Sequence, residues 1–192
     1  MAPQFYLASA SPRRRQLLEQ LGLRFEVVVA DVDESPRPGE MPQDYVSRLA
    51  EAKALAGAER LGNPALPVLA ADTAVVLEGA ILGKPRDRED AIAMLGRLGG
   101  RSHQVLSAIA LWQSDRVRVA VSLSEVKFRR IGEEEAAAYW DSGEPRDKAG
   151  AYGIQGLGGM FVEHLAGSYS GVVGLPLFET TALLQEAGIG VL

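Results

Sequence analysis

The chain opens with the stretch Phe5-Tyr6-Leu7-Ala8-Ser9-Ala10-Ser11-Pro12-Arg13-Arg14-Arg15-Gln16-Leu17-Leu18. Its first four residues are apolar and predict a strand, and Ser11 followed by Pro12 predicts a helix with Ser11 as its N-cap. Leucines at positions 17, 18 and 21 give that helix an apolar face, and Gly22 is expected to end it.

Three consecutive arginines, Arg13 to Arg15, stand in the first turn of this predicted helix. A helix N-terminus carries partial positive charge, so cations there are unfavourable unless an anion binds among them. Arg14 also continues the apolar stripe of leucines, and an inward arginine needs a partner. With the hydroxyls of Ser9 and Ser11, this pattern indicates a phosphate site. The alternative for Arg14 is a structural carboxylate partner, or a side chain that reaches back to solvent.

Two further charged residues interrupt apolar patterns. Residues 42–60 predict a helix whose apolar stripe includes Lys53, which either reaches solvent or pairs with an anionic group. Residues 67–77 predict a strand with Asp72 in its middle, where aspartate is disfavoured and costly to bury unpaired. Asp72 is therefore either half of a buried pair with an arginine, or a general base or metal ligand at the edge of a pocket.

Three loop segments carry weaker signals. Glu34 lies in an acidic, proline-rich loop that is either solvated surface or a source of carboxylates for a cleft. Lys84 precedes Pro85, so its backbone is expected to be extended, which either aims the ammonium into a cleft or leaves it exposed. The glycine-rich segment 143–159 has neither the P-loop pattern nor the dinucleotide-binding pattern. It is either flexible, or it approaches a ligand closely and lets Gln155 hydrogen-bond to a base edge.

Composition narrows the class of protein. The 192 residues are 47% hydrophobic and 23% charged, which suits one globular domain over 1–192 with room for two lobes. The net charge of −5 argues against a nucleic acid polymer as partner and suits a small anionic ligand. Without cysteine and with only two histidines, a hard cation on carboxylate oxygens is the metal to expect. The sequence shows no secretion signal or bilayer-spanning run, so we expect a cytoplasmic protein without membrane contact.

The remaining segments alternate between strand and helix patterns, which predicts an α/β fold around a mixed, twisted sheet. Asp87 is the expected cap of one helix, and residues 167–174 are expected to form a loop. The expected strands are 25–29, 80–82, 104–112, 116–129 and 160–165, and the expected helices are 87–98, 133–140 and 175–187.

Four segments stand out together: Leu7-Ala8-Ser9-Ala10-Ser11-Pro12-Arg13-Arg14, Ala71-Asp72-Thr73, Gly83-Lys84-Pro85-Arg86-Asp87, and Asp147-Lys148-Ala149-Gly150-Ala151-Tyr152-Gly153-Ile154-Gln155-Gly156. In this order they resemble the motifs of the Maf family of nucleoside triphosphate pyrophosphatases, over almost the whole chain. The resemblance implies a Maf/ITPase-like fold with two lobes around a central cleft. It also implies hydrolysis of a nucleoside triphosphate between the α and β phosphates, which gives the monophosphate and pyrophosphate.

The resemblance also implies roles for the candidate residues. Asp72 would activate the attacking water as general base, and the catalytic group would also include Glu34, Lys53 and Lys84. A divalent cation, Mg²⁺ or Mn²⁺, would bridge phosphate oxygens with Glu34 and Asp72. One aspartate cannot easily be both base and metal ligand, and the sequence leaves that open. The residues expected to hold the triphosphate are Ser9, Arg13, Arg14, Lys53 and Lys84.

The Maf family divides by substrate. The branch acting on dTTP and UTP carries an arginine, a threonine after the aspartate and a glutamine in the glycine-rich loop, which here are Arg13, Thr73 and Gln155. The resemblance therefore implies a house-cleaning enzyme that favours dTTP and UTP. The alternatives are the branch acting on 7-methyl-GTP, a nucleotide-binding regulator of cell division without turnover, and a nucleotidyltransferase. A homodimer is an open expectation.

Overall fold

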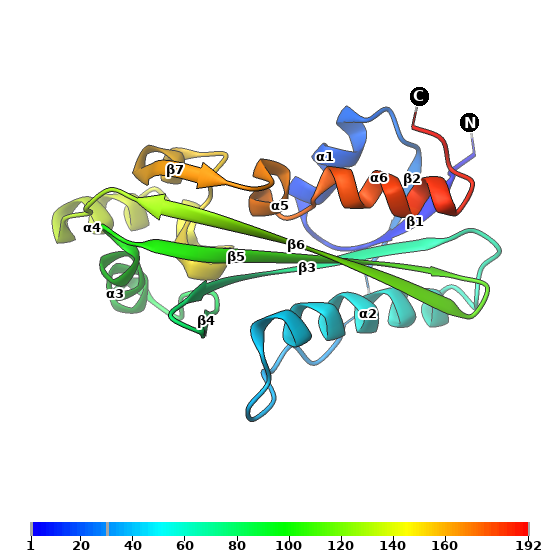
Figure 1. The fold of residues 1–192 in the computed structure, drawn as a ribbon, viewed down its shortest axis with the longest axis horizontal. Helices are drawn as coiled ribbons and strands as arrows, with labels where there is room; N and C mark the ends of the chain where they lie inside the picture. Colours follow the sequence, from blue (N-terminus) through cyan, green and yellow to red (C-terminus); the bar gives the residue numbers. More distant parts are fainter. Residues whose placement is uncertain (1, 30, 192) are drawn as a thin grey trace.

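The computed structural model describes residues 2–29 and 31–191 of the expected 1–192 domain, and a mixed β-sheet forms its centre (Figure 1). The strands within this part of the chain are β1 (Phe5–Ala8), β2 (Phe25–Val28), β3 (Val68–Leu77), β4 (Ala80–Leu82), β5 (Ser102–Gln113), β6 (Arg116–Phe128) and β7 (Val162–Ala166). Their order is β2-β1-β3-β5-β6-β7, with β4 paired to β3. β1 is parallel to β2 and β3, and the other pairings are antiparallel. The predicted α/β fold around a mixed sheet is confirmed.

Two helices begin at the side-chain caps that the sequence predicts. The Ser11 side chain accepts a hydrogen bond from the backbone N–H of Arg14, and Asp87 accepts one from Asp90. The described α-helices are α1 (Pro12–Gln20), α2 (Pro42–Arg60), α3 (Arg88–Leu98), α4 (Glu133–Asp141), α5 (Tyr169–Val173) and α6 (Leu177–Glu186). Three 3-10 turns, η1 (Glu144–Asp147), η2 (Ala149–Ala151) and η3 (Leu157–Phe161), occupy the glycine-rich segment and its end.

The long strands separate two layers of helices. Side chains of a strand alternate between faces, so Leu69 and Ala71 pack with the core under α1 and α6, whereas Val68 and Ala70 pack against α2. A third cluster fills the other end of the molecule, where α3, α4 and Phe161 pack together. Figure 1 shows the two lobes that result: β1, β2, α1 and α6 gather at one end of the long strands, and α3, α4 and β7 at the other.

The hairpin formed by β5 and β6 extends through both lobes. Gln113 pairs with Arg116 across a turn in which Ser114 and Asp115 both have positive φ, at 51° and 61°. This backbone is typical of the type I′ turns whose twist matches that of adjoining strands. The two strands then run side by side to Ser102 and Lys127, which gives the molecule its long axis.

One expected loop and several element boundaries differ from the sequence expectation. Residues 167–174 are not a simple loop, because Tyr169–Val173 forms the short helix α5, capped by the Ser168 hydroxyl, which accepts from the backbone N–H of Gly171. The last strand begins at Val162 rather than at 160, because the residues before it coil into η3. Among the described residues, no helix is both long and apolar enough to cross a bilayer.

Candidate active site

An interruption in sheet pairing creates the main cavity. β1 pairs with β3 only at Val68 and Leu69, and β4 pairs with the same edge only from Val75 onward. Among the described strands, nothing pairs with the edge between these points. Asp72 and Thr73 lie there and point to opposite faces of the sheet. Because the edge is open, both side chains line one cavity of about 680 Å³.

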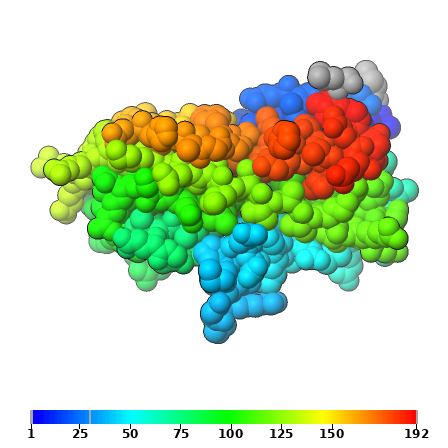
Figure 2. Space-filling view, viewed as in Figure 1, coloured from blue at the N-terminus to red at the C-terminus, as the bar shows by residue number. Residues whose placement is uncertain are grey.

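The structure brings every candidate residue to this cavity. They come from the loop after β1, α1, the loop before α2, α2, β3, the segment after β4 and the glycine-rich segment. In Figure 2 the loop before α2, in light blue, stands out from the body of the molecule. The predicted residues that line the cavity are Ser9, Arg13, Arg14, Glu34, Lys53, Asp72, Thr73, Lys84 and Gln155.

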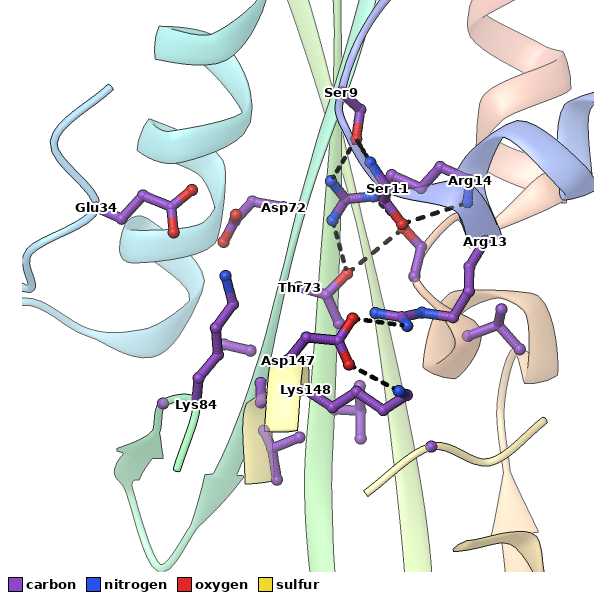
Figure 3. Close-up of a pocket in the computed structure, with 18 of the residues that line it drawn as sticks. Ser9, Ser11, Arg13, Arg14, Glu34, Asp72, Thr73, Lys84, Asp147 and Lys148 are labelled. Carbon is purple, nitrogen blue, oxygen red and sulfur yellow. Dashed lines mark hydrogen bonds and ion pairs between the residues drawn. The ribbon is translucent and has the colours of Figure 1, made fainter. Parts of the chain in front are cut away.

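Two carboxylates share one ammonium on the α2 side of the cavity. Lys53 Nζ lies 2.6 Å from Glu34 Oε1 and 2.7 Å from Asp72 Oδ1. The side chains of Lys53 and Asp72 are only 12% and 10% exposed, so Lys53 does not reach back to solvent. The ammonium of Lys84 also points toward these two carboxylates (Figure 3).

The pKa values of the two carboxylates are shifted in opposite directions. Burial raises the pKa of Asp72 above its ordinary value, although the charge and hydrogen bond of Lys53 act against this. Burial also acts to raise the pKa of Glu34, but the hydrogen bond from Lys53 and the charges of Lys53, Lys84 and Arg14 outweigh it, so that pKa is lowered. Asp72 is thus the better proton acceptor of the pair, and Glu34 the more firmly ionised.

Arg14 lies on the other side of β3, half-buried and with uncharged partners (Figure 3). Its Nε donates to the carbonyl of Gly174 at 2.9 Å, and its Nη1 donates to Ser9 Oγ at 3.1 Å. Its Nη2 is 3.5 Å from Thr73 Oγ1, which in turn lies 2.8 Å from Ser107 Oγ. Burial lowers the pKa of Arg14. The structure therefore gives this arginine neutral partners in place of the structural carboxylate considered above, and its charge faces the cavity.

Asp147 and Lys148 also line the cavity, although the sequence pattern indicates no role for either residue. Asp147 lies 3.5 Å from Arg13 Nη1 and 2.8 Å from Lys148 Nζ. Gln155, from the glycine-rich segment, is exposed and lines the cavity. An acidic and a basic residue before glycines are common on surfaces, so the sequence alone carried no distinguishing signal for this pair.

Glu34 and Asp72 form a sparse donor set for a metal. Within residues 2–29 and 31–191, no group of three or more histidine, aspartate or glutamate side chains is arranged to hold an ion. Mg²⁺ is commonly held by one or two carboxylates together with substrate phosphates and water. The pair fits that kind of ion, bound with a phosphate substrate, and does not form a cage for an ion alone.

Comparison with known proteins places this chain in a family. A family model described as Maf-like protein matches residues 4–187. The chain belongs to the Maf family. A Maf relative from Hahella chejuensis is 56% identical over 184 residues, covering 95% of this chain and 92% of its own. A relative from Methylococcus capsulatus is 56% identical over 184 residues (96% and 91%), and one from Bordetella parapertussis 54% over 196 residues (98% and 95%).

Each of these three Maf proteins carries the name dTTP/UTP pyrophosphatase. Among solved structures, that of the Staphylococcus aureus Ham1 protein matches with a TM-score of 0.46 and 18% identity, over 65% of this chain and 71% of that one. The family membership inferred from the four sequence motifs is confirmed.

Proposed function

We propose that this Maf protein hydrolyses nucleoside triphosphates between the α and β phosphates, with dTTP and UTP as favoured substrates. The observation that carries the proposal is the cavity itself, which joins a buried carboxylate of raised pKa to cationic side chains from several segments. The names of relatives at 54–56% identity support the choice of substrates.

The chemistry requires charge neutralisation and a proton acceptor. Transfer of a phosphoryl group depends mainly on positioning and on electrostatic stabilisation of the phosphate oxygens. Arg13, Arg14 and Lys84 would supply that positive charge, and the hydroxyl of Ser9 would add a donor. A water molecule would attack phosphorus as the bond to the α–β bridging oxygen breaks, and Asp72 would accept the proton of the water.

Lys53 would act mainly on the two carboxylates. Because its ammonium already contacts two carboxylates at 2.6 and 2.7 Å, it would fix Glu34 and Asp72 in place, and any phosphate contact would be additional. A bound Mg²⁺ or Mn²⁺ would neutralise phosphate charge. Glu34 would be its firmer ligand, since Glu34 stays ionised to lower pH, and Asp72 would remain available as base.

Base selection would fall to the glycine-rich segment. Uracil and thymine present an acceptor, a donor and an acceptor on their pairing edge, and the Gln155 amide offers both kinds of group. Thr73 would act through Arg14, which it contacts. The net charge of −5 supports a small anionic substrate over a nucleic acid polymer. A cytoplasmic location and a homodimer stay predictions.

A screen for pyrophosphate release over all common nucleoside triphosphates, with Mg²⁺ and with water as the only acceptor, tests the proposal. We expect dTTP and UTP to be the best substrates, with kcat/KM for CTP lower by at least about tenfold, because cytosine reverses part of the donor–acceptor pattern. A preference for 7-methyl-GTP would place the protein in the other branch. Binding without turnover would favour a regulatory role, and turnover that needs a second acceptor would favour a nucleotidyltransferase.

A further inference from the structure

Within the glycine-rich segment, one carboxylate near its start holds the part that carries Gln155. The side chain of Glu144 accepts hydrogen bonds from the backbone N–H groups of Leu157 at 2.8 Å and Gly158 at 3.0 Å. It also accepts one from the hydroxyl of Tyr139 at 2.6 Å. These bonds lower the pKa of Glu144 although burial acts to raise it, so the carboxylate is ionised near neutral pH.

Tyr139 extends the same anchor to the other side of Gln155. While it donates to Glu144, its hydroxyl oxygen accepts the backbone N–H of Gly153 at 3.1 Å. Lys148, which lies before Gln155 in the same segment, donates to the backbone carbonyl of Glu144 at 2.6 Å. The backbone is therefore fixed before Gln155 through Tyr139 and after it through Glu144.

The glycines of the segment are required by this arrangement. A Cβ at Gly156 would collide with the carboxylate of Glu144, and one at Gly158 would lie 2.6 Å from the Tyr139 hydroxyl. A Cβ at Gly153 would lie 2.8 Å from Cε of Lys148. Glycine permits this close approach but is the costliest residue to order, so the segment depends on side-chain anchors for a fixed shape.

We propose that Glu144 is a positioning residue for base selection, which holds residues 153–158 in the shape that presents Gln155 to the nucleobase. The inference rests on the proposed function, because Gln155 selects a base only if a nucleotide is the substrate. Glu144 does not line the cavity, so it acts through the backbone of the segment.

The test compares Glu144→Gln with Glu134→Gln, which makes the same charge change on the exposed face of α4. The amide of glutamine cannot accept an N–H at both positions, so one anchor bond is lost. We expect the ratio of kcat/KM for UTP to kcat/KM for CTP to fall roughly tenfold in Glu144→Gln, as loss of one bond to a charged group allows. The control should keep the ratio, and inhibition by pyrophosphate should be unchanged in both variants.

Amide hydrogen exchange without nucleotide gives a readout independent of turnover. The amides of Leu157 and Gly158 should exchange faster in Glu144→Gln than in the wild type, and at wild-type rates in Glu134→Gln. Tyr139→Phe, which removes the bond to Glu144 and the acceptor for Gly153, should accelerate the Gly153 amide and lower the same selectivity ratio.

The outcomes separate the two proposals. A wild-type protein that releases no pyrophosphate from any nucleotide overturns the proposed function, whatever the exchange rates. A wild type that selects UTP, with Glu144→Gln slowing UTP and CTP equally, makes Glu144 merely structural and overturns the positioning role while the proposed function stands.

Discussion

Two carboxylates of the site share the Lys53 ammonium but differ in their surroundings. Asp72 is in the middle of a buried strand, whereas half of the Glu34 side chain is exposed on a loop. Burial favours the neutral form of Asp72, and the nearby cations favour the ionised form of Glu34. Such divergent environments are what allow two similar acids to take different roles at one pH.

Replacing the proposed base should stop the reaction without unfolding the protein. We expect Asp72→Asn to lower kcat by about 10²-fold or more, as the loss of a positioned base does, while the far-UV circular dichroism spectrum stays unchanged. Steady-state kinetics with UTP measure the effect. Turnover close to that of the wild type would remove Asp72 from the mechanism.

The raised pKa of Asp72 also predicts how activity and stability depend on pH. Asp72 must be ionised to accept a proton, so the acidic limb of the kcat/KM profile should lie above the ordinary aspartate pKa of 3.8. An acid whose folded pKa is raised contributes stability that is present below its ordinary pKa and is lost as pH rises through the raised value. As pH rises through the raised pKa of Asp72, activity should therefore increase. Over the same pH range, the contribution of Asp72 to the free energy of unfolding should decrease. A limb at or below the ordinary value would contradict the shift.

Arg14 should contribute to binding of the triphosphate, and Arg15 should not. Arg14→Ala removes a half-buried guanidinium that faces the cavity, so KM for the triphosphate should rise by about tenfold or more. Arg15→Ala, at an exposed position of the same helix turn, is the matched control and should leave KM unchanged. A large loss of thermal stability with unchanged KM would show instead that Arg14 has only a structural role.

At the scale of elements, the glycine-rich segment packs against β3 and hydrogen-bonds to the segment after β4. The backbone N–H of Gly150 donates to the carbonyl of Gly83, the neighbour of Lys84, at 3.0 Å. Gly150 has a φ of +68°, and a Cβ there would lie 2.9 to 3.0 Å from the atoms of Val75 in β3. This turn therefore couples two cavity-lining segments that are far apart in the sequence.

A methyl group at Gly150 should disturb that junction. We expect Gly150→Ala to lower the free energy of unfolding by about 1–3 kcal/mol, through backbone strain and overpacking against Val75. Gly96→Ala in α3, where no atom lies within 4 Å of the added Cβ, should instead raise it by about 0.5–1 kcal/mol. Urea denaturation measures both, and equal effects at the two positions would contradict the packing.

The sequence predicts elements well where local chemistry decides them. Caps at Ser11 and Asp87 and the positive-φ turn at Ser114 and Asp115 are local features, and their elements lie where expected. The short helix α5 was missed because a few residues rich in serine and glycine carry no helical period. The sequence also does not predict the anchor formed by Glu144 and Tyr139. Side chains that accept hydrogen bonds from backbone N–H groups leave no pattern in the spacing of residues.

At the scale of the whole molecule, the cavity exists because β1 ends before β3 does. The open edge between the β1 and β4 pairings lets side chains from both faces of the sheet meet, and the lobes of Figure 1 supply the rest of the lining. The candidate residues that the sequence indicates, largely through the family resemblance, all line this cavity. The sequence could not predict that Lys53 pairs with both carboxylates, because this depends on how α2 packs on the sheet.

Product analysis by ³¹P NMR tests the central claim most directly. UTP incubated with the protein and Mg²⁺ should give UMP and pyrophosphate in equal amounts, with neither UDP nor orthophosphate as an initial product, and Asp72→Asn should leave UTP largely intact. Formation of UDP and orthophosphate, or equal rates for the wild type and Asp72→Asn, would contradict hydrolysis between the α and β phosphates at this site.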